Sequence, residues 1–129
     1  MDAQPLTLWC AMVIDREDPE DASALAREVA RSLGLSVTRL NARPYPKLGP
    51  HTRVDLDLQG APFRGFEDMA AQVDRICGAL SDGQGWSRGG EHPEEMEYER
   101  ILDARTDPLR PDWLLWLHVE AAPNSRLQP

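Results

Sequence analysis

The 129-residue chain predicts an α+β fold, a ferredoxin-like split β-α-β sandwich (βαββαβ) whose antiparallel sheet has the order 4-1-3-2. Three observations predict it: a nearly continuous apolar run at residues 6–14, two amphipathic helical patterns, and segments of apolar–polar alternation. An inserted segment of about thirty residues precedes the last strand in this arrangement. We expect a single domain over residues 1–122 and a flexible tail over residues 123–129.

The first half of the chain carries clear start and stop signals. Residues 6–14 are apolar at nearly every position, as in a strand buried on both faces. Asp18, followed by a proline, predicts the N-cap of a helix, and Gly34 predicts its end. A second strand is expected at residues 35–41, followed by an irregular loop at residues 43–50, which contain three prolines and a glycine.

The middle of the chain contains one regular segment of each kind. Residues 52–59 alternate between apolar and polar side chains, which predicts a third strand with Val54, Leu56 and Leu58 on its buried face. After a turn at residues 60–65, apolar residues recur with helical spacing over residues 66–80. This spacing predicts the second helix.

Two structures compete for the inserted segment. Residues 81–90 are rich in glycine and predict a loop. In residues 93–105, Tyr98, Ile101 and Leu102 would share a helical face, whereas Met96 and Tyr98 alternate with glutamates as in a strand. We expect a helix there, with the strand as the alternative.

The last strand is expected at residues 112–120, after a turn bounded by prolines. One of its faces is apolar, and the other carries Trp116, His118 and Glu120. If both helices cover one face of the sheet, the other face is open unless the inserted segment covers it. Trp9 and Trp116 are expected to reach that open face.

The net charge of −8 is concentrated in two short acidic runs, residues 15–21 and 91–99. The predicted topology brings both runs to one end of the sheet, beside a loop bearing Arg43, Lys47 and Arg53. An acidic surface disfavours nucleic acid and anionic membranes as partners, because phosphate binding needs clustered Lys and Arg. The apolar run near the start is too short to span a bilayer and follows no basic residue, so we expect a cytoplasmic protein.

The leading functional hypothesis is a non-enzymatic protein-binding module, in its most concrete form a bacterial immunity protein that neutralises a toxin domain. A concentrated acidic field steers a partner with a basic surface, and tryptophans anchor it. No catalytic motif is present, and no cofactor is predicted. The expected partner-binding residues are Glu17, Asp18, Glu94, Glu95, Glu97, Glu99, Trp86 and Trp116.

Two alternatives use the open sheet face. In the first, His118 approaches Asp55 or Asp57 and forms a site for a small molecule or a metal ion, which would also permit an enzyme. In the second, the face associates with another copy of the chain to form a homodimer. Cys10 and Cys77 are expected to be small core residues, because neither has neighbours that would activate a thiol.

Overall fold

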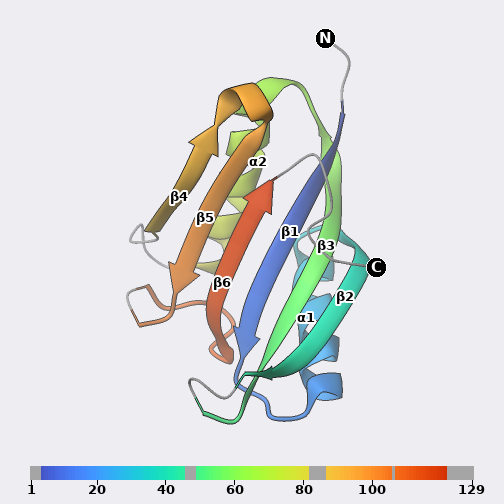
Figure 1. Cartoon of the computed structure of the whole chain (residues 1–129), viewed down its shortest axis with the longest axis vertical. Coiled ribbons are helices and arrows are strands. Elements are labelled where there is room, and N and C mark those ends of the chain that lie inside the picture. The colour runs from blue at the N-terminus through green and yellow to red at the C-terminus, as the bar shows by residue number, and fades with distance from the viewer. Residues whose placement is uncertain (1–3, 46–48, 82–86, 106, 122–129) are drawn as a thin grey trace.

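The computed structural model describes residues 4–45, 49–81, 87–105 and 107–121, which form an α+β fold with a six-stranded sheet (Figure 1). Every strand pair is antiparallel, and the strands lie in the order β2-β3-β1-β6-β5-β4. Along the chain the described elements are β1 (Gln4–Ile14), α1 (Pro19–Ser32), β2 (Ser36–Tyr45), β3 (His51–Phe63), α2 (Gly65–Leu80), β4 (Ser87–His92), the 3-10 helix η2 (Pro93–Glu95), β5 (Glu97–Asp103) and β6 (Leu114–Ala121).

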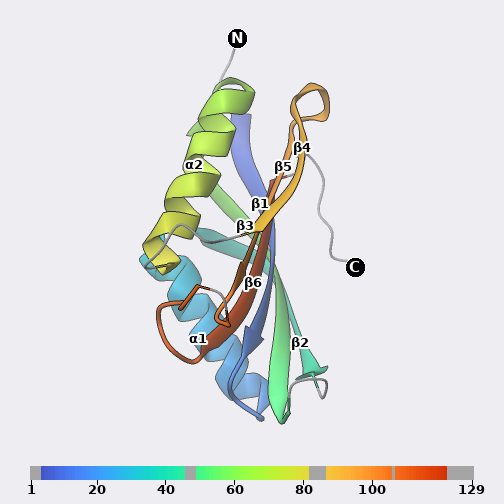
Figure 2. The ribbon, with the colours of Figure 1, turned by 90° about the vertical axis from the view of Figure 1, so that its left-hand side faces the viewer.

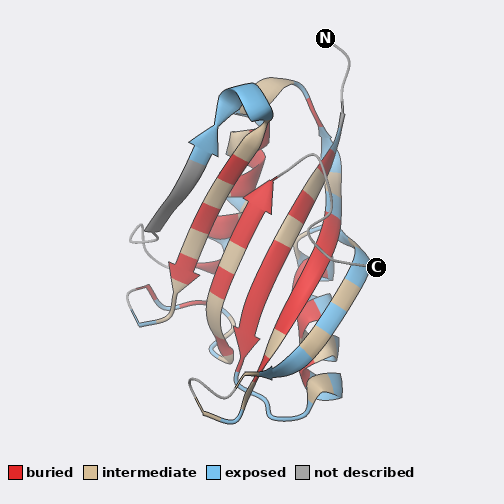
Figure 3. Ribbon diagram, viewed as in Figure 1, coloured by how far each residue is buried: buried red, intermediate tan, exposed pale blue. Residues whose placement is uncertain are grey.

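The molecule has two layers, because α1 and α2 both pack on the same face of the sheet (Figure 2). The hydrophobic core lies between the layers, since the helices bury their apolar stripes against the alternate residues of the strands. Burial is greatest on the central strands and falls toward the edge strand β2 (Figure 3). Among the described residues, no helix is both long and apolar enough to cross a membrane. We call the sheet face opposite the helices the open face.

The boundaries of α1 confirm the sequence signals. The Asp18 side chain accepts a hydrogen bond from the backbone N–H of Glu20 at 2.9 Å, which satisfies one of the donors left free at a helix start. At the other end Gly34 has φ +75°, a left-handed conformation that glycine adopts without the steric cost of a Cβ. The helix therefore begins and ends where the sequence predicts.

The α+β class is confirmed, but the order of the whole sheet differs from the predicted 4-1-3-2. Four of its strands, β6-β1-β3-β2, do stand in that order, and β5 and β4 extend the sheet beyond β6. The expected helix over residues 93–105 is wrong, because only Pro93–Glu95 form a short 3-10 turn and Glu97–Asp103 form a strand. Met96 closes the turn with φ 56°, a conformation that is uncommon for methionine and that the sequence does not signal.

The other differences concern element ends. The predicted loop at residues 43–50 starts too early, since β2 continues to Tyr45. The predicted turn at residues 60–65 is also too long, because β3 continues to Phe63. Of the predicted loop at residues 81–90, the last four residues belong to β4, and residues 82–86 lie outside the described part of the chain. The expected tail at residues 123–129 lies outside it as well.

The two acidic runs lie at opposite ends of the sheet, so the prediction that they gather at one end is wrong. The first run follows the end of β1, where the backbone N–H of Asp15 donates to the carbonyl of Trp113. The second run spans the turn between β4 and β5, at the end of the sheet where Tyr98 pairs with Ala121 and Ala121 with Leu8 (Figure 1). The inserted segment extends the sheet beside β6 as a hairpin, and the turn of this hairpin carries the second acidic run to the far end of the sheet.

Candidate functional site on the open sheet face

The central strands align one histidine and two glutamates on the open face. Directly paired residues of antiparallel strands lie on the same face, so the strand register fixes the neighbours of each side chain. Glu120 of β6 pairs with Glu99 of β5 on one side and with Trp9 of β1 on the other. His118 lies two residues before Glu120 and therefore on the same face.

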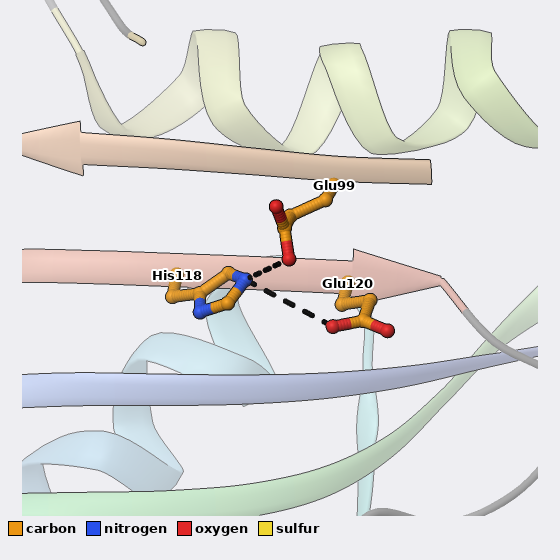
Figure 4. Close-up of side chains that lie close together, drawn as sticks. All are labelled: Glu99, His118 and Glu120. Atoms are coloured by element: carbon orange, nitrogen blue, oxygen red, sulfur yellow. Dashed lines mark hydrogen bonds and ion pairs between the residues drawn. The ribbon is translucent and has the colours of Figure 1, made fainter. Parts of the chain in front are cut away.

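These three side chains form a compact cluster, shown in Figure 4. The Nε2 atom of His118 lies 2.8 Å from a carboxylate oxygen of Glu99 and 3.9 Å from one of Glu120. One ligand atom from each residue lies within 4.8 Å of the other two. The side chains of His118, Glu99 and Glu120 are 17%, 29% and 11% exposed, so the cluster is largely shielded from water.

The electrostatics of the cluster favour a bound cation. Glu99 and Glu120 are directly opposite each other on neighbouring strands, and like charges in that position destabilise a sheet. Partial burial weakens solvent screening, which makes the repulsion between two carboxylates larger than on an exposed surface. His118 offsets one negative charge at most, and only when it is protonated. A divalent ion in the same position offsets both.

Two tryptophans frame the histidine. The ring centroid of Trp9 lies 4.8 Å from that of His118, and the centroid of Trp116 lies 5.9 Å from it, both in edge-to-face arrangements. The strands hold these rings in place, since Trp9 is on β1 and Trp116 is on β6 with His118. As expected from the sequence, both tryptophans reach the open face, where they restrict the orientation of the imidazole.

The aspartates expected beside His118 lie elsewhere on the open face. Asp55 of β3 and His118 of β6 both pair with Ala11, so β1 separates them by two strand spacings, or about 10 Å. Asp55 instead forms ion pairs with Arg53 at 3.2 Å and Arg43 at 3.6 Å. The structure thus gives His118 a carboxylate neighbour, as expected, but from the strand that the sequence did not reveal.

The residues expected to bind a partner do not form one patch. Glu17 and Asp18 are exposed before and at the start of α1. Glu94 and Glu95 are exposed in η2 at the other end of the sheet, whereas Glu97 and Glu99 lie on β5 and Trp116 on β6. Trp86 falls outside the described residues, and so does Lys47 of the loop expected beside the acidic runs.

The loop arginines expected beside the two acidic runs have other neighbours. Arg43 and Arg53 pair with Asp55, while Asp15 pairs with His51 at 3.2 Å. The neighbour of the first run at Asp15 is therefore a histidine that the sequence did not single out.

Both cysteines are buried free thiols in the core, as expected. Burial, together with the neighbouring charge of Asp74, raises the pKa of Cys77 to about 12. Burial likewise raises the pKa of Cys10, and the adjacent Cys77 adds to this effect. At neutral pH neither thiol ionises appreciably, which leaves both unsuited to nucleophilic chemistry.

Comparisons with protein-family models, with curated proteins and with solved structures find nothing that matches this chain. Its function therefore has to be inferred from the geometry of the open face.

Proposed function

We propose that the protein binds a divalent transition-metal ion on the open sheet face through Glu99, His118 and Glu120. The observation that carries the proposal is the close approach of the His118 Nε2 atom to two glutamates that face each other across neighbouring strands. This arrangement concentrates negative charge and supplies three ligand atoms in one partly buried place.

The donor set indicates the kind of ion. An imidazole nitrogen with carboxylate oxygens suits zinc, manganese or ferrous iron better than calcium or magnesium, which prefer oxygen ligands throughout. Three protein ligands also leave at least one coordination position for water or a small molecule, a feature of metal sites that act on or carry a ligand. The edge-to-face contacts of Trp9 and Trp116 with His118 would limit the orientation of the imidazole toward a bound ion.

The present contact between His118 and Glu99 has to change when an ion binds. The same Nε2 atom cannot donate a hydrogen bond to Glu99 and coordinate a metal ion. A bound ion therefore takes the place of the hydrogen atom between the two side chains.

Isothermal titration calorimetry with Zn²⁺, together with the visible absorption of Co²⁺, tests the proposal on the full chain. The wild-type protein should bind one ion, and Glu99→Gln and His118→Asn should each weaken binding by about tenfold or more. Glu97→Gln is the matched control, because Glu97 lies two residues from Glu99 on the same strand and outside the cluster. Its affinity should equal that of the wild type.

Asp55→Asn separates this site from the one expected from the sequence, and it should also bind like the wild type. Absence of stoichiometric binding by the wild type would contradict the proposal. So would equal affinities for wild type, Glu99→Gln and His118→Asn. In that case the contact between His118 and the two glutamates only stabilises the sheet.

The immunity-protein hypothesis stays a prediction. It relied on two acidic runs acting together on one basic partner, and they lie at opposite ends of the sheet.

A further inference from the structure

The cluster of two glutamates and a histidine has apolar neighbours on both sides of β6. His118 pairs with Ile101 of β5. Glu120 pairs with Trp9 of β1, and Trp116 lies two residues before His118 on β6. Both tryptophan rings contact the imidazole edge to face. An ion held by the cluster is therefore bordered by two indole rings and an aliphatic side chain.

The surroundings of the cluster also lack positive charge. In the described parts of β1, β5 and β6, no Lys or Arg points to the open face. Arg100 of β5 points to the helix layer instead, where it pairs with Asp74 and Glu91. Arg105, in the turn after β5, pairs with Asp103 at 2.7 Å.

This charge distribution limits the ligands that a bound ion can accept. Glu99 and Glu120 together offset both charges of a divalent ion. A ligand with one negative charge gains the bond to the metal and leaves a small net charge. Each further negative charge on the ligand would repel the two glutamates in a partly buried place, where screening by water is weak.

We propose that the bound ion takes an aromatic monocarboxylate in its open coordination position, an inference that rests on the proposed metal site. The carboxylate supplies an oxygen ligand of the kind that zinc, manganese and ferrous iron accept. Its single charge suits an ion that two glutamates already neutralise. The aromatic ring packs against Trp9, which lies next to Glu120 on the neighbouring strand.

The distances allow a ligand on the ion to reach Trp9. The ring centroids of Trp9 and His118 are 4.8 Å apart. A zinc ion bound to Nε2 lies about 2 Å from that nitrogen, which places the ion within about 8 Å of the Trp9 ring. A ring carried by the bound carboxylate and turned toward β1 closes this gap to about 4.5–7 Å, the separation at which aromatic pairs interact. Trp9 is half-buried, so part of its ring is accessible for this contact.

The visible absorption of Co²⁺ bound to the full chain reports the entry of a ligand and tests the proposal with three probes. Benzoate and acetate share the carboxylate and differ in the ring. The Co²⁺-loaded wild type should bind benzoate at least about tenfold more tightly than acetate. Terephthalate adds a second carboxylate at the far side of the ring, where it cannot chelate the same ion. It should bind more weakly than benzoate, because the second charge meets no cation.

Two substitutions of Trp9 test the contact with the ring. Trp9→Ala should reduce the preference for benzoate over acetate to about threefold or less. Trp9→Phe is the matched control, because it keeps an aromatic ring at the same position, and it should retain most of the preference. The affinity for acetate should be the same in the wild type and in both variants, since acetate does not reach this side chain.

The outcomes separate this inference from the metal site. A wild-type chain that binds no Co²⁺ would overturn both. Stoichiometric Co²⁺ binding with equal affinities for benzoate and acetate would overturn the aromatic ligand alone. The same holds if terephthalate binds as tightly as benzoate, or if Trp9→Ala keeps the full preference. Circular dichroism checks that the variants fold, and if Trp9→Ala does not, the three probes on the wild type decide.

Discussion

One buried arginine links the inserted hairpin of β4 and β5 to helix α2. Replacing this arginine should lower the free energy of unfolding less than replacing its carboxylate partners. Arg100 of β5 faces the helix layer with a side chain that is only 5% exposed. Its guanidinium lies 2.9 Å from Glu91 of β4 and 3.5 Å from Asp74 of α2. Tyr98 joins the same network by donating a hydrogen bond to Asp74 at 2.7 Å. One cation thus links both strands of the hairpin to α2.

The magnitudes follow from the unequal burial of the partners. The side chains of Asp74 and Glu91 are 45% and 42% exposed, so water solvates them again if Arg100 is replaced. Arg100→Met keeps an apolar stem against Tyr98 and should cost about 1 kcal/mol or less. Asp74→Asn with Glu91→Gln leaves the buried guanidinium without either carboxylate and should cost about 3–5 kcal/mol.

Urea unfolding followed by circular dichroism measures both free energies by linear extrapolation. The double variant should be the less stable by at least about 2 kcal/mol. The control is the single variant Glu95→Gln in η2. Because Glu95 is exposed, this substitution should leave the free energy of unfolding unchanged. The reasoning would be refuted if Arg100→Met lowered the free energy of unfolding as much as the double variant does. The carboxylates would then not be compensating for the burial of the arginine charge.

Three further predictions concern stability. Asp18→Ala removes the N-cap hydrogen bond of α1 and should lower the free energy of unfolding by about 1 kcal/mol in urea titrations, whereas Asp18→Ser should not. Leu117→Ala opens a cavity at a core position that is 1% exposed and should cost about 2–5 kcal/mol, measured in the same way. The pKa of Cys77 rises on folding from 9.0 to about 12. The contribution of this thiol to the free energy of unfolding is therefore complete below pH 9 and is lost as the pH rises toward 12. Cys77→Ala should make the alkaline loss of stability shallower in unfolding curves between pH 8 and 11; an unchanged slope would contradict this.

The parts of the fold that the sequence predicts are those with strong local signals. The helix α1 has a side-chain cap at Asp18 and a glycine at Gly34, and β3 alternates strictly, so their positions follow from local chemistry. The hairpin of β4 and β5 lacks such signals. Its glycines at Gly89 and Gly90 are typical of loops, and its turn ends on a methionine in a left-handed conformation.

The candidate site was only half predictable for the same reason. Trp116 and His118 alternate with apolar residues along the last strand, which places them on the open face from sequence alone. The partner of His118 depends on which strand lies on the other side of β6, and the strand order is set by the tertiary structure rather than by local sequence. Once Glu97–Asp103 is recognised as a strand, its alternation puts Glu99 on the open face, and strand pairing brings it to His118.

Because the two acidic runs are separated, they should act on a small cationic partner as two independent surfaces. Glu17 and Glu95 are on the order of 30 Å apart by strand rise, about three Debye lengths at 0.1 M salt. The two runs should therefore attract a short cationic probe independently. In a double-mutant cycle with octalysine at 0.1 M salt, Glu17→Lys and Glu95→Lys should each weaken binding, with a coupling free energy below about 0.5 kcal/mol. A larger coupling would mean that one probe senses both runs, and a single basic partner spanning the sheet would again be the better explanation of the charge.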